Sequence, residues 1–182
     1  MEYNGKSFDA IVATPCCGKS FLCDKYPNLF VDVDEERLKC KYDVPENVTR
    51  KKLEETKGNR IFPRKFHGDK LIKELYKRLD IYVKQGKTLI LAPHDESIKY
   101  LTENNIKFCF VFPKNTIKQE IINRMIRRNN PQETIKQISD MFEDFYTRNI
   151  KENKSVVHYE FDKDEYLEDI VFQKFNYKIK EK

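Results

Sequence analysis

The chain has 182 residues, of which 39% are hydrophobic and 36% charged, which suits one domain with its own core and excludes a disordered chain. The formal net charge is +5, and no apolar run approaches the roughly 18 residues of a membrane span. We expect a cytoplasmic protein (host cytoplasm if the chain is viral), because residues 1–6 are polar and do not form a signal peptide. Five cysteines without a CxxC pair predict reduced thiols, not a disulfide framework or a zinc site.

The most specific motif follows a predicted strand over 8–13 and opens a predicted helix over 18–26. It reads Ala-Thr-Pro-Cys-Cys-Gly-Lys-Ser over 13–20, a phosphate-binding loop pattern with alanine in place of the usual first glycine. Backbone N–H groups and the helix N-terminus would hold a polyphosphate, with Lys19 at its terminal phosphates and the Ser20 hydroxyl on Mg²⁺. The predicted nucleotide-binding residues are Ala13, Pro15, Cys16, Cys17, Gly18, Lys19, Ser20 and Phe21.

Two alternatives remain at this loop. The motif could be a proline-containing turn before an ordinary helix. Cys16 and Cys17 could form a redox switch, because a helix N-terminus lowers a thiol pKa, or they could be small residues that fit a tight loop.

The second predicted strand, 28–33, runs into an acidic stretch. Asp32 and Asp34 would point to one face of that strand, beside the phosphate loop. Asp32 could then hold Mg²⁺ through water, and Asp34 could orient or deprotonate an acceptor hydroxyl. The alternative is an acidic helix start at 34–36, which complements a helix dipole.

Residues 36–68 contain prolines, glycines and many charges, and we expect an inserted, partly irregular segment that binds the acceptor. The wider range 37–87 carries 16 Lys and Arg against 7 Asp and Glu, a net charge of +9. This excess favours an anionic substrate or a nucleic acid, although a solvated lysine-rich helix surface would give the same count.

Several side chains of this segment are candidate acceptor contacts. The candidate ligands of a substrate phosphate are Arg50, Arg60 and Arg64, between which the sequence does not choose. The residues predicted to bind the substrate are Asp34, Arg37, Arg64 and His94. The aromatic residues Tyr42, Phe62 and Phe66 could stack on a base, but core packing is the simpler interpretation for each of them.

The middle of the chain alternates helix and strand patterns. A helix over 69–85 presents Leu71, Leu75 and Leu79 at i,i+4 spacing, and a strand over 88–92 follows. His94 falls at that strand's end, as a substrate contact or an exposed turn residue, and Asp95 would cap the next helix, 95–103. A further strand is predicted over 107–112.

A helix over 115–128 carries Arg124, Arg127 and Arg128 on one side. Guanidinium groups lower the barrier of phosphoryl transfer, so this helix and a second over 131–150 could form a closing lid, 115–150. The alternative is a cationic last turn that satisfies the helix dipole.

A strand over 155–161 and a helix over 163–171 complete the pattern, and the tail 172–180 would add an edge strand or pack as an arm. Alternating strands and helices predict a single domain over 1–182 with an α/β, three-layer P-loop NTPase fold, a five-stranded mainly parallel sheet and a helical lid. Ligands bind beyond the carboxyl ends of such strands.

The chain resembles a P-loop nucleoside or nucleotide kinase. The features that carry the resemblance are the 13–20 loop, the Asp32-Val33-Asp34 strand end, the strand ends at His94 and 111–113, and the arginine segment 124–131. The resemblance is to the compact type often encoded by bacteriophages and large viruses. It implies ATP and Mg²⁺ as cofactors, an Asp-x-Asp pair like that of shikimate-kinase-like enzymes, and a lid at the arginines. The third strand lacks the terminal aspartate of many such enzymes, so either Asp32 takes that role or catalysis is impaired.

The leading hypothesis is an ATP-dependent phosphotransferase, monomeric or homodimeric, that acts on a nucleoside monophosphate or deoxynucleotide. Its catalytic residues would be Lys19, Asp32, Asp34, Arg124, Arg127 and Arg128. Alternatives are a kinase of a nucleic-acid end or modified base, which the basic segment motivates without favouring it, and a non-catalytic nucleotide-binding protein.

Overall fold

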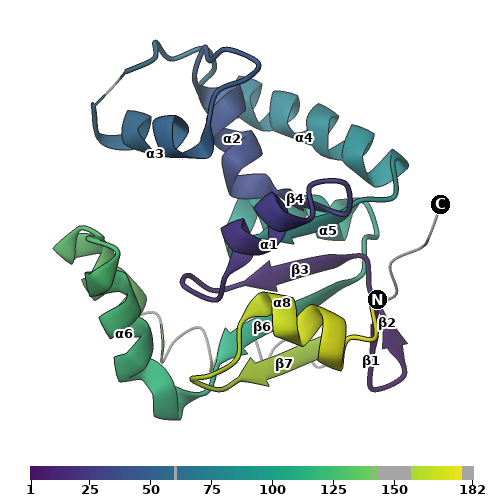
Figure 1. Ribbon diagram of the computed structural model, residues 1–182. Coiled ribbons are helices and arrows are strands. Elements are labelled where there is room, and N and C mark those ends of the chain that lie inside the picture. The colour runs from purple at the N-terminus through teal and green to yellow at the C-terminus, as the bar shows by residue number, and fades with distance from the viewer. Residues whose placement is uncertain (60, 141, 143–156, 178–182) are drawn as a thin grey trace.

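The computed structural model describes residues 1–59, 61–140, 142 and 157–177. A five-stranded sheet lies at its centre, with the order β4-β5-β3-β6-β7 and parallel pairing throughout (Figure 1). The strands are β3 (Ala10–Ala13), β4 (Phe30–Asp32), β5 (Thr88–Leu91), β6 (Phe108–Pro113) and β7 (Val157–Phe161). The predicted α/β fold with a five-stranded parallel sheet is confirmed.

Helices cover both faces of the sheet because the strands are apolar on both sides. Ile11 of β3 belongs to one core cluster, which includes residues of α1, α6 and the C-terminal segment. Its neighbour Val12 belongs to the other cluster, with residues of α2, α4 and α5. Successive side chains of a strand point to opposite faces, so these two clusters form the two interfaces of a three-layer fold.

Four predicted helices appear within a few residues of their expected bounds. They are α1 (Lys19–Lys25), α4 (Gly68–Lys84), α5 (Asp95–Glu103), and α6 (Lys118–Arg127), which the 3₁₀ turn η1 (Asn115–Ile117) precedes. The predicted leucine stripe of α4 is buried. Residues 132–140 are also helical, while most of the remainder of the predicted helix 131–150 lies outside the described residues. No helix of the described part is long and apolar enough to cross a membrane.

The stretch after β4 differs from the sequence expectation. The strand stops at Asp32, and helix α2 (Val33–Lys41) begins at once. The segment 36–68 is partly irregular, as expected, but it also holds most of α2 and all of α3 (Arg50–Asn59). An antiparallel bridge between Tyr42 and Arg64 joins the irregular stretch after α2 to the one before α4.

The two ends of the described chain pack together. The chain begins with an antiparallel hairpin of β1 (Glu2–Tyr3) and β2 (Lys6–Ser7). The sequence analysis did not predict this hairpin. The predicted helix 163–171 begins later, as α8 (Leu167–Asp169), and continues as a π-helical turn, η2 (Ile170–Lys174). Over 172–177 the tail is an arm and not an edge strand; residues 178–180 lie outside the described residues.

Candidate active site

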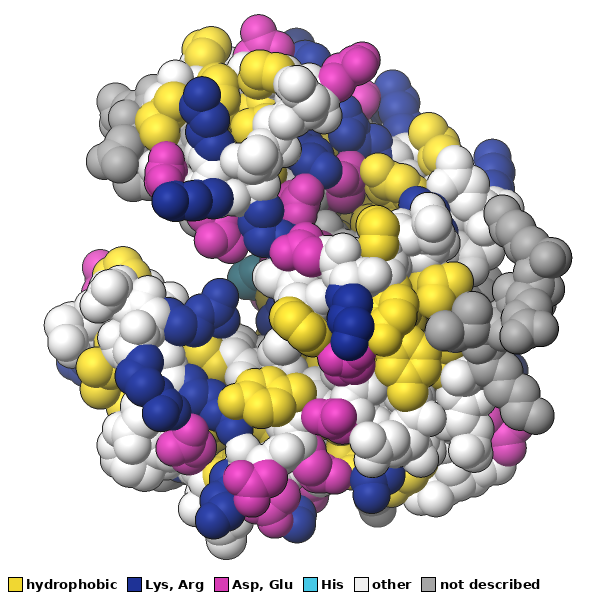
Figure 2. All heavy atoms as spheres, in the orientation of Figure 1, with side chains coloured by type: hydrophobic (Ala, Val, Ile, Leu, Met, Phe, Trp, Pro, Cys, Tyr) yellow, Lys and Arg dark blue, Asp and Glu magenta, His cyan; other side chains and the backbone are white. Residues whose placement is uncertain are grey.

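The candidate site lies at the carboxyl ends of the parallel strands, where the loop after β3, the start of α2 and the turn after β5 meet. The molecule is hollowed on one face between the part built from α2 and α3 and the part that carries α6 (Figure 2). Lys and Arg side chains occur on both sides of this hollow. This is the edge of the sheet at which the sequence analysis expected ligands.

The predicted phosphate loop contains two residues with positive φ. Cys16 has φ +62° and Gly18 has φ +95°, and Gly18 is the N-cap of α1. Lys19 Nζ donates to the carbonyl oxygens of Ala13 and Thr14 at 3.0 Å each, so the lysine folds back over the loop. Ala13 lies within β3 without a positive φ, so the fold does not require the usual glycine there.

The loop cysteines differ in their surroundings. Cys16 is partly exposed, while Cys17 is buried and donates to the Thr14 carbonyl at 3.1 Å. Burial raises the pKa of the Cys17 thiol, with only partial opposition from Lys19. Cys17 is thus a poor nucleophile and does not support the redox alternative.

Asp32 lies directly behind the loop. Ser20 Oγ donates to Asp32 Oδ2 at 3.2 Å, and Asp32 Oδ1 accepts from the backbone N–H groups of Asp34 and Glu35 at 3.0 and 3.3 Å. A hydroxyl beside a carboxylate fits Mg²⁺, which prefers hard oxygen ligands and keeps several of its waters. Within the described ranges no three acidic, His or Cys side chains are grouped to hold a metal alone, so a cation here would also need ligands from the nucleotide and water.

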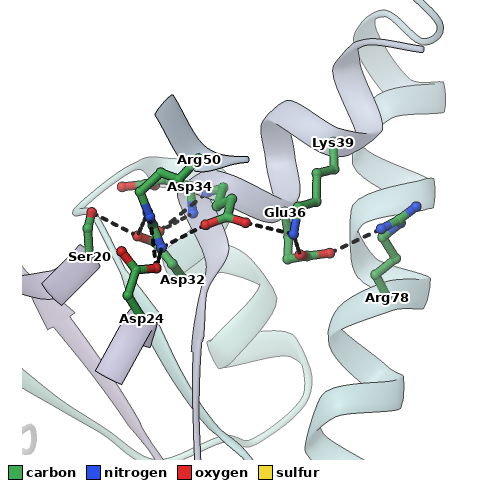
Figure 3. A network of polar contacts seen from close by, with 9 residues as sticks. Ser20, Asp24, Asp32, Asp34, Glu36, Lys39, Arg50 and Arg78 are labelled. Atoms are coloured by element: carbon green, nitrogen blue, oxygen red, sulfur yellow. Dashed lines mark hydrogen bonds and ion pairs between the residues drawn. The ribbon is translucent and has the colours of Figure 1, made fainter. Parts of the chain in front are cut away.

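Arg50, the first residue of α3, joins Asp32 to two other carboxylates (Figure 3). Its guanidinium lies 2.7 Å from Asp32 Oδ2, 2.6 Å from Glu35 Oε2 and 3.0 Å from Asp24 Oδ1. Burial disfavours the charge, but the carboxylates, Asp32 first, outweigh it and raise the pKa of Arg50. Arg50 therefore neutralises this group of carboxylates, and its candidate role as a ligand of the acceptor phosphate stays a prediction.

Asp34 occupies the first turn of α2, so the expectation that it shares a strand face with Asp32 is wrong. The alternative of an acidic helix start is correct: Asp34, Glu35 and Glu36 all lie in that turn. Asp34 still faces the site edge, since its Oδ1 lies 4.0 Å from Nε2 of the half-exposed His94. His94, not Asp95, is the N-cap position of α5.

The two other predicted acceptor contacts lie farther out. Arg37 pairs with Glu96 of α5 at 3.2 Å, and Arg64 is an exposed residue of the bridge to Tyr42. Tyr42 is buried and Phe66 packs against the core, which agrees with the core-packing interpretation of both residues. Arg60 lies outside the described residues.

The three arginines of α6 and its end have different surroundings. Arg124 is buried, with 7% of its surface exposed, and donates to the carbonyl oxygen of Cys16 at 3.2 Å. Arg127 is exposed and pairs with Glu120 at 2.7 Å, and Arg128 Nη1 lies 3.8 Å from Cys16 Sγ. The structure therefore brings Arg124 and Arg128 to the predicted phosphate loop, at Cys16.

No family model matches the chain, and no curated protein matches its sequence. Among solved structures, the chain is similar to a gluconokinase from Sinorhizobium meliloti 1021. The two chains share 13% identity over 94% of this chain and 92% of that chain, with a TM-score of 0.48. A likeness this distant says nothing about the acceptor.

Proposed function

We propose that the chain is a single-domain, ATP-dependent phosphotransferase of the P-loop kinase type that acts on a small molecule. One arrangement carries this proposal: a phosphate loop at the end of the central strand, with Lys19 on the loop carbonyls and Ser20 bonded to Asp32. A loop that only turned the chain would need neither a lysine folded over its carbonyls nor a hydroxyl–carboxylate pair behind it.

Each group has a separate task in this proposal. Lys19 would leave the loop carbonyls to contact the terminal phosphates of ATP. Ser20 and Asp32 would hold Mg²⁺, which would neutralise phosphate charge during transfer. The Ser20–Asp32 contact supports Asp32 as the substitute for the missing aspartate of the third strand.

The acceptor would enter between α3 and α6, on the side of Asp34 and His94. The pair, 4.0 Å apart, can take the proton of an alcohol acceptor, whereas the phosphate of a nucleoside monophosphate is already ionised and would need the pair only to orient its sugar hydroxyls. Arg127 and Arg128 could contact the transferred phosphoryl group. We propose a nucleoside monophosphate or deoxynucleotide as acceptor, as in the compact phage and viral kinases that the sequence resembles.

An acceptor panel tests this function directly. ADP formation from ATP is measured with nucleosides, nucleoside monophosphates, deoxynucleotides and polyhydroxy acids, and products are identified by mass spectrometry. Lys19→Ala should reduce turnover to background while the protein keeps its melting temperature, and Lys99→Ala on the exposed face of α5 should retain full activity. Undiminished turnover in Lys19→Ala would refute the assignment.

The basic segment supports a second candidate, a kinase of nucleic-acid ends. Lys70, Lys73, Lys77 and Lys84 are exposed on α4 at spacings that place them along one side. Binding of a labelled oligonucleotide across a salt series checks this candidate, because phosphate contacts weaken steeply as salt rises. If ATP binds but neither a small molecule of the acceptor panel nor the oligonucleotide is phosphorylated, the chain is a nucleotide-binding protein without this activity.

A further inference from the structure

Arg124 uses all three nitrogens of its guanidinium within the protein. Nε donates to Glu120 Oε1 at 3.2 Å, Nη1 donates to the Cys16 carbonyl at 3.2 Å, and Nη2 donates to the Lys163 carbonyl. The guanidinium also lies over the Tyr166 ring, 4.6 Å from its centroid. A buried guanidinium with this many partners is held in one position and is not poised to reach a transferring phosphoryl group.

These contacts connect three parts of the chain. Glu120 is on α6, Cys16 is in the phosphate loop, and Lys163 with Tyr166 precedes α8. Tyr166 in turn lies close to Gly18, since a Cβ added at Gly18 would be 3.6 Å from the tyrosine ring. Arg124 is therefore the bridge through which α6 and the segment before α8 support the loop from one side.

The orientation of two loop peptides follows from these contacts. Arg124 holds the carbonyl of Cys16, and the backbone N–H of Leu167 holds the carbonyl of Cys17 at 2.7 Å. A trans peptide points its N–H opposite to its C=O, and the described residues contain no cis peptide bond. The N–H groups of Cys17 and Gly18 therefore point away from Arg124 and Leu167, and successive N–H groups of this kind form an anion site.

We propose that Arg124 is a positioning residue of the phosphate loop, which aims the backbone donors of the loop at the phosphates of a nucleoside triphosphate. The proposal rests on the proposed function for the identity of the ligand. It differs from the role expected from sequence, in which Arg124 contacts the transferred phosphoryl group. That role then falls to Arg127 and Arg128 alone among the three.

Cys16 provides a readout that needs no enzymatic activity. It is the partly exposed cysteine of the loop, whereas the other four cysteines are buried. Site-resolved alkylation of native protein by a maleimide should therefore modify Cys16 first. Without nucleotide, Arg124→Met should increase the rate at Cys16 by roughly five- to tenfold, the factor that corresponds to one lost hydrogen bond, and Lys99→Met should leave it unchanged. An unchanged Cys16 rate in Arg124→Met would overturn the proposal.

Nucleotide binding supplies the second measurement. Arg124→Met should raise the Kd and the KM for ATP by roughly tenfold or more, with a smaller effect on kcat. Arg124→Lys keeps the charge but loses the planar fork, so it should restore binding only in part. A loss of kcat at unchanged KM and unchanged Cys16 rate would instead assign Arg124 to the transferring phosphoryl group.

These outcomes separate the positioning role from the proposed function. If ATP with Mg²⁺ does not protect Cys16 in the wild-type protein and no acceptor is phosphorylated, the proposed function fails. The Cys16 rates of the variants without nucleotide would still show whether Arg124 holds the loop. If Arg124→Met does not fold, the same rate and Kd measured for Arg124→Lys decide the matter, and wild-type values in that variant count against the proposal.

Discussion

At the scale of single residues, Asp32 serves two structural elements with one carboxylate. Its Oδ1 caps α2 by accepting hydrogen bonds from two backbone N–H groups. Its Oδ2 accepts hydrogen bonds from the Ser20 hydroxyl and the Arg50 guanidinium. A carboxylate held from so many sides is oriented before any ligand arrives, which favours binding because less freedom is lost. Helix capping and phosphate-site chemistry are thus compatible in the same residue.

Glu168 gives a pH-dependent prediction. It accepts from Lys25 Nζ at 2.6 Å and from the Tyr26 hydroxyl at 2.8 Å, and the Lys25 hydrogen bond lowers the pKa of Glu168 from its ordinary value of 4.5. A lowered pKa in the folded state adds stability above the unfolded pKa and removes it as pH falls through the folded pKa. Glu168→Gln should therefore lower the urea midpoint at pH 7.

The difference in urea midpoint between wild type and Glu168→Gln should become smaller below the pKa of Glu168 in the unfolded chain. It should vanish at pH values below the pKa of Glu168 in the folded protein. Urea titrations at pH 7 and through the acid range check this. The effect should be modest, because the pair is partly solvated. A difference that stays constant down to the lowest pH would mean that the glutamate contributes through packing and not through charge.

At the scale of elements, the helices and strands with strong local patterns could be predicted from sequence. The leucine stripe of α4 and the apolar strands β3 and β6 are examples, because periodicity reports the buried faces directly. The hairpin at the N-terminus also had a local signal, Asn4-Gly5, and both residues have positive φ. Its strands have only two residues each, too few for periodicity to register.

Contacts between distant elements could not be predicted in this way. Spacing correctly grouped the arginines on one helix, but it could not tell which of them is buried. Arg124 meets Cys16 and Tyr166, which lie 108 and 42 positions away, only because the sheet places those segments together. Arg50 likewise depends on how α3 folds back over the acidic start of α2.

The anchoring of α3 gives the next prediction. Arg50→Met leaves the buried carboxylate of Asp32 without its cation, and this should cost roughly 2–4 kcal/mol of unfolding free energy, since Asp32 keeps its other hydrogen bonds. Lys51→Met, the exposed neighbour on the same helix, is the matched control and should stay within about 0.5 kcal/mol of wild type. Urea denaturation measures both variants.

Limited proteolysis shows whether the loss is local. If Arg50 anchors α3, the segment 42–67 should be cleaved faster in Arg50→Met than in Lys51→Met, at urea concentrations at which both proteins remain folded. Equal cleavage of the two variants would argue that α3 is held by Leu53 and its other buried contacts instead.

At the scale of the whole molecule, two parts lie on either side of the hollow in Figure 2. One part is built from α2 and α3, of which α3 lies within the basic range 37–87, and the other part carries α6. The five-stranded sheet is continuous, and both α2 and α6 contribute residues to the core clusters on its faces. Closing the hollow by moving α2 or α6 as a whole would therefore disturb the core.

The C-terminal arm belongs to that core, and its loss should reduce stability without altering the site. Phe175 is fully buried, 5.0 Å from the ring of Phe8 and 5.6 Å from that of Tyr159. Phe175→Ala should lower the unfolding free energy by about 3–5 kcal/mol, while the exposed Phe21→Ala serves as the control for stability only. The Kd for ATP, measured well below the melting temperature, should remain at the wild-type value, because the rings that pack on Phe175 belong to Tyr3, Phe8 and Tyr159 and not to the loop. A weakened Kd at full folding would show instead that the arm supports the loop through η2 and α8, which adjoin Tyr166.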